Sequence, residues 1–317
     1  MARPLRIEYP GAYYHVTSRG NEQKPIFRDN QDRGKFLDLL GRAAEQFHLR
    51  VHAYVLMGNH YHLLVETPRG ELNRALRYLN GVYTQSFNRR HGRVGHLFQG
   101  RYKAILVDRE SYLLELSRYI HLNPWRLRRS ENPFAYRWSS LRAYGGKAAI
   151  PPWLTVKEVL SYFGSKGKKG YRGFVLEGIK EGVKTPWEEV RGQAVIGSEG
   201  FVDEMVERYL KGMRDRKELS GIREIVGARP EDVLREVGKH FGIEGGEISG
   251  RGQRYTEPRY LASYLLRRYC LMSLREIGER VGLHYSAVGN AIRRVRESPT
   301  RTMARALREL EANFKNQ

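Results

Sequence analysis

The chain has 317 residues, of which 40% are hydrophobic and 11% aromatic, so it is long enough for two domains and apolar enough to give each a core. Its 56 lysines and arginines exceed its 35 aspartates and glutamates by 56 − 35 = 21, a surplus that repels cationic partners and favours a polyanion such as nucleic acid. No run of about 18 apolar residues is present and the N-terminus lacks a signal-peptide stretch, so we expect a cytoplasmic protein without a membrane partner. The single cysteine, Cys270, excludes an internal disulfide and a cysteine-rich zinc site.

The first half of the chain alternates between strand and helix patterns. Four runs rich in β-branched and aromatic residues predict strands, and three runs with apolar residues every three or four positions predict helices. The expected strands are 12–20, 51–57, 61–66 and 97–108, and the expected helices are 29–48, 71–89 and 111–122. Ser111 is the N-cap candidate of the last helix, and Pro124 is expected to end it.

This order, βαββαβ followed by a helix, is typical of an α+β ferredoxin-like fold, an antiparallel sheet with helices on one face. Three segments are expected: a catalytic domain at 1–150, a helical extension and linker at 151–229, and an all-α helix-turn-helix domain at 230–317. The Gly/Lys-rich stretch 164–170 has no periodicity and is predicted to be a surface loop that could touch phosphates.

Two histidines on one predicted strand are the first candidates for chemistry. Side chains of a strand alternate between its faces, so His60 and His62 share a face and bring two imidazoles to the spacing of metal ligands. Both could also be ordinary packed polar groups, which is the commoner outcome for an arbitrary His-x-His pattern.

A second pair strengthens the metal interpretation. Tyr119 and Asn123 lie four apart in a predicted helix, so a phenol and an amide share one face. If that face lies over the histidines, Asn123 completes a three-ligand site for Mg2+ or Mn2+ with open positions for phosphate oxygens. Tyr119 then points at the same phosphate, with the metal and Arg118 stabilising its phenolate. Taken alone, Tyr119 would be an ordinary buried aromatic.

The His-x-His strand and the Tyr-x-x-x-Asn-Pro helix about 60 residues later resemble the REP-associated tyrosine transposases, which are single-tyrosine HUH nucleases. The stretches 14–21 and 98–103 add to the resemblance, which covers residues 3 to about 146. It implies a ferredoxin-like fold, single-stranded or hairpin DNA as substrate and a divalent metal on His60, His62 and Asn123. It also implies that Tyr119 attacks DNA, leaving a 5′-phosphotyrosine and a free 3′-OH.

Basic residues near these motifs are the candidates for DNA contacts. Arg19, Arg101 and Lys103 flank strand-like segments, and Arg118 precedes the candidate nucleophile. A solvated charged face would explain each of them equally well.

The segment 271–297 has a helix-turn-helix pattern. Ser273 caps its first helix, Gly282 permits the turn, and Tyr285 or Ser286 opens a second helix that places Arg293 and Arg294 outward for duplex DNA. From Pro230 onward the chain resembles the DNA-binding domain of the bacterial replication initiator DnaA. It departs where that domain reads its site, because 284–287 is His-Tyr-Ser-Ala in place of Asp-His-Thr-Thr.

Three functions follow from these patterns. The leading one is a DNA transposase and strand transferase, and the main alternative is a non-catalytic, sequence-specific DNA-binding regulator that has kept the fold. An RNA-binding ferredoxin-like protein is disfavoured because the aromatic RNP signature is absent. Whether the chain acts as a homodimer stays open at this stage.

Overall fold

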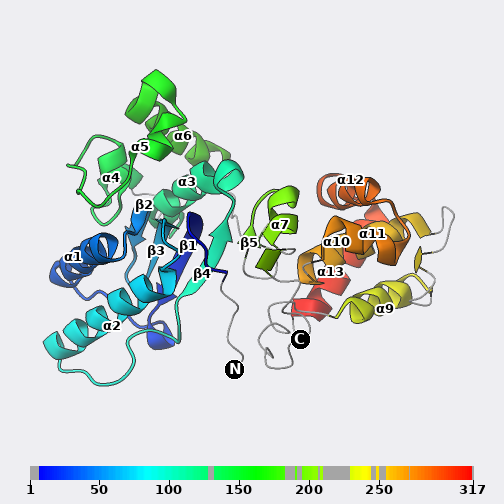
Figure 1. The fold of residues 1–317 in the computed structure, drawn as a ribbon, viewed down its shortest axis with the longest axis horizontal. Helices are drawn as coiled ribbons and strands as arrows, with labels where there is room; N and C mark the ends of the chain where they lie inside the picture. Colours follow the sequence, from blue (N-terminus) through cyan, green and yellow to red (C-terminus); the bar gives the residue numbers. More distant parts are fainter. Residues whose placement is uncertain are drawn as a thin grey trace. The chain divides into compact units, whose positions relative to one another are not determined.

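The computed structural model describes residues 7–127, 132–182, 190, 195–205, 208–209, 229–243, 248–249, 255–270 and 272–315. The chain divides into two compact units, Ile7–Glu188 and Glu189–Gln317, with Met1–Arg6 grouped with the second (Figure 1). We describe each unit by itself.

The first unit is built on an antiparallel sheet. Its strands are β1 (Ala12–Arg19), β2 (Arg50–Leu56), β3 (His60–Thr67) and β4 (Lys103–Val107), and they lie in the order β2-β3-β1-β4. Helix α1 (Asn30–Gln46) connects β1 to β2, and α2 (Leu72–Arg90) connects β3 to β4. This is the predicted ferredoxin-like arrangement, and the α+β fold class is therefore confirmed.

The two crossover helices cover one face of the sheet because their apolar stripes meet the strand residues that point to that side (Figure 1). Tyr61 of β3 shows the packing: its ring lies 4.8 Å from that of Phe36 in α1, and its hydroxyl donates to Asn80 of α2 at 2.8 Å. Asp29 caps α1 by accepting from the Asp32 amide at 3.0 Å.

A later helix, α3 (Arg109–Leu127), packs on the opposite face. It is longer at both ends than the predicted 111–122. Asp108, and not the predicted Ser111, caps it, accepting from the Glu110 amide at 3.2 Å and the Ser111 hydroxyl at 2.9 Å. The expectation that Pro124 ends this helix was wrong, since a proline removes only one backbone donor and its φ is compatible with a helix. Strand β4 is shorter than predicted, because 97–102 contains Gly100 at φ 68°.

The expected surface loop at 164–170 is also wrong, because this stretch contains a 3-10 turn (Gly164–Lys166) and the first residues of α6 (Gly167–Glu181). Tertiary packing overrides the low helix propensity of its glycines: Tyr171 and Val175 are buried, and the Tyr171 hydroxyl bonds to Ser117 and His121. The remaining short elements of this unit are 3-10 turns at Asn21–Gln23 and Pro133–Ala135, α4 (Leu141–Tyr144) and α5 (Lys157–Ser161).

The second unit is mainly helical, as predicted for the C-terminal domain. Its described elements are β5 (Val195–Ile196), α7 (Glu199–Met205), α9 (Pro230–His240), α10 (Thr256–Cys270), α11 (Leu274–Val281), α12 (Tyr285–Glu297) and α13 (Arg301–Lys315). Its apolar faces share one core, whose buried members include Val233, Val237, Leu261, Leu265, Ile277, Val288 and Ile292.

Helices α11 and α12 form the predicted helix-turn-helix. Ser273 and Glu276 make a reciprocal capping box, and Gly282 ends α11 in the left-handed region at φ 69°. Val288, Ile292 and Val295 of α12 are buried, whereas Arg293 and Arg294 are exposed.

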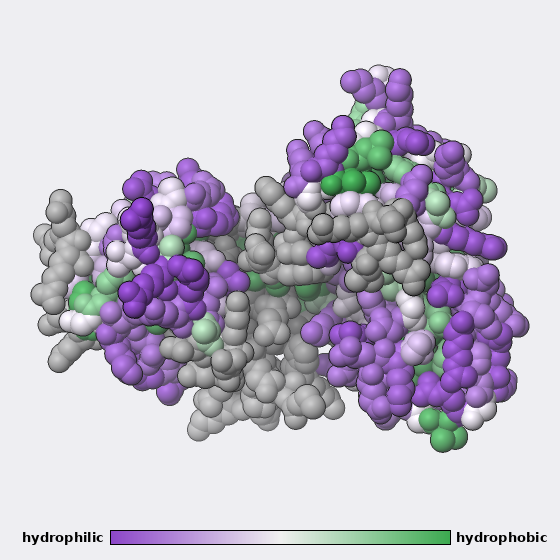
Figure 2. All heavy atoms as spheres, turned by 180° about the vertical axis from the view of Figure 1, so that it is seen from behind, coloured by the Kyte–Doolittle hydropathy of each residue, from purple (hydrophilic) through white to green (hydrophobic). Residues whose placement is uncertain are grey.

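The face of the molecule seen in Figure 2 is predominantly hydrophilic, with hydrophobic side chains in small separate groups. This agrees with the low mean hydropathy of −0.61. Among the described helices, none combines the length and the apolar character needed to cross a membrane.

Gly282 offers a test of the second unit. An added Cβ would lie 2.6 Å from the Ser249 carbonyl oxygen, so Gly282→Ala should lower the free energy of unfolding of this unit by about 1–2 kcal/mol. The matched control is Gly289→Ala within α12. The added Cβ would lie 3.9 Å from the Leu274 side chain of α11, so this substitution should be neutral or stabilising. Hydrogen exchange of the α10–α12 amides measures both changes, and equal protection in the two variants would contradict the prediction.

Candidate active site

Strand β3 places His60 and His62 on the sheet face that α3 covers, opposite the face of α1 and α2. Their ring centroids lie 5.1 Å apart. In the antiparallel register Thr17 lies opposite His62 and Arg19 lies opposite His60, so β1 contributes its own side chains to the same face.

His15 of β1 is the residue that sequence reasoning missed. Its Nε2 lies 2.9 Å from Nδ1 of His62, and the two rings are stacked with centroids 5.1 Å apart. This hydrogen bond occupies Nδ1 of His62 and leaves Nε2 as the nitrogen for another partner, the usual arrangement in which a second group orients a metal-binding histidine. The strand alternation places His15 on the same face as Thr17, but the sequence does not give the register that brings it to His62.

Burial holds these histidines in the neutral form. It lowers the pKa of His15 to about 3 and the pKa of His62 well below its usual value, and repulsion from the charges that His15 and His60 would carry when protonated, and from Arg126, adds to the effect on His62. Burial, followed by the charge of Arg19, also lowers the pKa of His60. A neutral imidazole is the form that binds a metal ion, so the electrostatics of this face suit metal ligation.

Helix α3 adds the other two predicted residues. Tyr119 is 5% exposed, and its ring centroid lies 6.1 Å from that of His62 and 6.4 Å from that of His15. Asn123 is buried one turn later, and its side-chain nitrogen donates to the Tyr119 carbonyl at 3.0 Å. With that nitrogen engaged, the amide oxygen is the remaining ligand atom, and two imidazoles with an amide oxygen suit a divalent cation.

A buried hydrogen-bond network holds α3 from its other side. His121 lies between Tyr171 of α6, at 2.6 Å, and Ser140, at 2.7 Å. Tyr171 also bonds to Ser117 at 3.0 Å, and Ser140 accepts from the Tyr54 amide of β2 at 2.9 Å. These bonds set the rotation of α3 about its axis and therefore the direction in which Tyr119 faces.

Of the cations near α3, Arg118 does not face Tyr119. It pairs with Glu115 at 2.6 Å and lies over the Phe174 ring of α6 at 4.0 Å. The guanidinium over Tyr119 is that of Arg126, whose Cζ lies 5.1 Å from the ring centroid. A residue seven positions after Tyr119 returns to the same helix face, which is a signal that the sequence already contained.

The remaining DNA-contact candidates are exposed. Arg19 bonds to Gln23 at 2.9 Å and lies beside His60, Lys103 lies opposite Thr17, and Arg101 precedes β4. In the second unit, Tyr285 is 57% exposed at the start of α12, and the Ser286 hydroxyl lies 2.8 Å from Nδ1 of His284.

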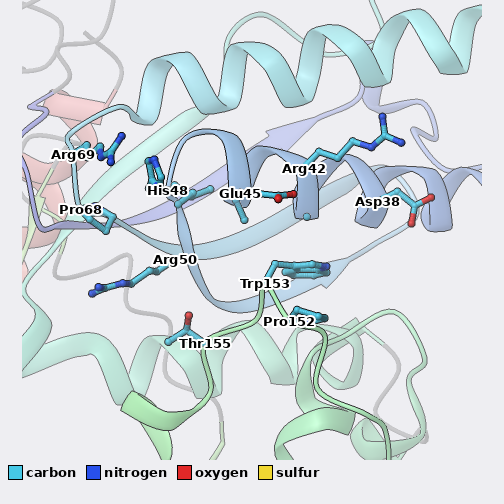
Figure 3. A pocket seen from close by; sticks show the side chains of 13 residues that line it. Asp38, Arg42, Glu45, His48, Arg50, Pro68, Arg69, Pro152, Trp153 and Thr155 are labelled. Carbon is cyan, nitrogen blue, oxygen red and sulfur yellow. The ribbon is translucent and has the colours of Figure 1, made fainter.

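Two other features of the first unit lie apart from these residues. His52, Glu66 and Glu158 gather within 4.8 Å, but Arg50 and Arg109 pair with the two carboxylates and balance their charge without an ion. A groove of about 1010 Å3 is lined by 13 residues that include Arg42, Arg69 and Trp153 (Figure 3) and none of the predicted site residues.

The chain matches known proteins separately in its two units. Residues 8–123 match the family model described as "Transposase IS200 like", and residues 230–295 match the model of the bacterial DnaA helix-turn-helix. The protein therefore carries an IS200-like transposase domain followed by a DnaA-type helix-turn-helix domain.

The curated proteins that match are DnaA proteins, each over a short part of this chain. DnaA of Thermus thermophilus is 38% identical over 73 residues, which are 22% of this chain and 17% of that protein. DnaA of Deinococcus deserti is 43% identical over 68 residues, 21% of this chain and 15% of that protein. The chain thus spans less than a fifth of the length of these relatives.

Among solved structures, a REP-associated tyrosine transposase bound to a REP hairpin is similar at a TM-score of 0.40 and 13% identity. The similarity covers 50% of this chain and 93% of that one.

Proposed function

We propose that the first domain is a DNA strand transferase that cleaves single-stranded hairpin DNA with Tyr119 as nucleophile. The observation that carries this proposal is that the Tyr119 ring lies 6.1 Å from the His62 ring, which lies 5.1 Å from that of His60, within an IS200-like transposase domain. Asn123 is one turn after Tyr119 on the same helix and bonds to its carbonyl. His15, which orients His62, belongs to the same group.

The reaction is an exchange of one phosphate ester for another. The phenol oxygen of Tyr119 loses its proton and attacks the scissile phosphorus, and the 3′ oxygen leaves and takes up a proton. The product is a 5′-phosphotyrosine with a free 3′-OH. Because the covalent link conserves the phosphodiester, the reverse attack by a 3′-OH joins strands without a nucleotide cofactor.

His60, His62 and Asn123 are the residues that would hold Mg2+ or Mn2+. When bound, the ion neutralises charge that develops on the scissile phosphate. The neutral imidazoles and the His15 to His62 hydrogen bond support this assignment.

The second domain would bring the enzyme to duplex DNA. Helix α12 presents Tyr285 and Ser286 at its start and the exposed Arg293 and Arg294 on its outer side, the arrangement in which a recognition helix meets bases and phosphates. Exposed Arg19, Arg101 and Lys103 would attract single-stranded DNA to the first domain.

The nucleophile is tested with labelled hairpin DNA, Mn2+ and a denaturing gel. Tyr119→Phe removes only a hydroxyl, so the variant should bind DNA normally and form no covalent adduct. Tyr112→Phe, on the same helix, is the control and should react like the parent. Adduct formation by the Tyr119→Phe variant overturns the assignment, and absence of cleavage by the parent on every hairpin tried supports the non-catalytic regulator instead.

Metal dependence is a separate prediction. EDTA should stop adduct formation, and His60→Ala or His62→Ala should weaken Mn2+ binding measured by calorimetry as well as cleavage, because each removes one ligand. His96→Ala, at an exposed position, serves as the control. Undiminished cleavage in EDTA would falsify the metal role.

Duplex binding is predicted to depend on α12. Replacing Arg293 and Arg294 together by Ala should reduce the slope of log affinity against log salt by about 0.9 for each phosphate that the protein no longer neutralises, while hairpin cleavage is retained. The control is Arg305→Ala on α13, where the side chain pairs with Glu309. An unchanged slope in the double variant would show that duplex is bound elsewhere.

A further inference from the structure

Arg126 stands out among the cations around Tyr119. It lies in the last turn of α3, seven residues after Tyr119 and three after Asn123, so all three share one face of the helix. Its Cζ is 5.1 Å from the centre of the Tyr119 ring. The guanidinium is therefore close to the candidate nucleophile, on the helix face that also carries the candidate metal ligand Asn123.

Two other arginines of α3 are held by acidic or aromatic partners, whereas Arg126 contacts the Tyr119 ring. Arg118 is engaged by Glu115 and Phe174, and Arg109 by Glu158 at 2.6 Å. Within the described part of the chain, the Arg126 guanidinium makes no hydrogen bond or ion pair, and it lies against the Tyr119 ring. Its side chain is half-buried, so its N–H groups are held at the site and are available to an incoming anion.

The chemistry of the proposed reaction identifies that anion. A guanidinium presents a planar fork of donors that matches two phosphate oxygens, and it keeps its charge at any working pH. Preorganised donors aimed at developing charge contribute strongly to phosphoryl transfer. Arg118 faces away from Tyr119, toward Glu115 and Phe174, so it supplies no such charge next to the phenol.

We propose that Arg126 is a catalytic residue that binds the non-bridging oxygens of the scissile phosphate while Tyr119 attacks. This inference rests on the proposed function, from which it takes the substrate. Arg126 exchanges no proton in the step, and its part is to neutralise the phosphate and to fix it in line with the phenol oxygen.

A purely structural role makes a different prediction. If Arg126 only packed on the Tyr119 ring, its removal would change the affinity for DNA by the same factor whether the scissile phosphate is charged or neutral. The two roles are therefore separated by a DNA hairpin that carries a neutral methylphosphonate at the scissile position, compared with the natural phosphodiester.

Binding is measured first in EDTA, so that no metal ion distinguishes the two DNAs, and in full-length protein carrying Tyr119→Phe, so that no chemistry intervenes. With Arg126 present, the methylphosphonate should weaken binding about tenfold or more, the size expected for a charged hydrogen bond. With Arg126→Ala added, the affinities for the two DNAs should lie within about twofold of each other, because the guanidinium that binds the charged phosphate more tightly than the neutral methylphosphonate has been removed. Arg89→Ala on α2, which lies on the other face of the sheet, should keep the discrimination of the parent.

Single-turnover adduct formation is then measured with Tyr119 intact. Arg126→Ala should slow the reaction of the phosphodiester by about 100-fold or more. Arg126→Lys keeps the charge but loses the planar pair of donors, so its rate should lie between those of the parent and Arg126→Ala. An equal loss of affinity for both DNAs in Arg126→Ala overturns the proposal even if Tyr119 forms the adduct. Failure of the proposed function appears differently, as absence of any Tyr119-dependent adduct in the parent protein.

Discussion

The register between β1 and β3 is the constraint on which the candidate site depends. Thr17 opposite His62 and Arg19 opposite His60 bring the imidazole of His15 within hydrogen-bond distance of His62. A slip of one residue would turn every side chain of β1 to the other face and separate the two rings. The apolar face beneath α1 and α2 prevents that slip, since it would expose residues such as Tyr14 and Val16, which are now buried.

The opposite side of the site is set by α3, and α3 is held by residues that lie outside the matched transposase segment 8–123. Tyr171 of α6 and Ser140 bond to His121, and α6 offers Phe174 and Gly178 to Arg118, where a Cβ at position 178 would come within 2.8 Å of the arginine. The helical extension therefore helps to orient Tyr119. Its contacts hold Arg118 against α6, away from the α3 face that carries Tyr119 and Arg126.

The division into two units fits a division of labour. The residues proposed for chemistry lie in the first unit, whereas the helix-turn-helix has a core of its own, closed by helices α9 to α13. The strong positive charge of the chain suits both tasks, because a basic surface raises the local concentration of single strands and duplex alike.

The sequence by itself determined the alternation of strands and helices, the ferredoxin-like order, the helix-turn-helix with its Ser273 cap and Gly282 turn, and the pairs His60 with His62 and Tyr119 with Asn123. Each of these follows from periodicity or capping within a short stretch of chain. Only the tertiary structure decided that His15 meets His62, that Arg118 turns to α6, and that the glycine-rich stretch 164–170 enters a helix. These outcomes depend on strand register and on packing between segments distant in the chain, and local patterns carry no information about either.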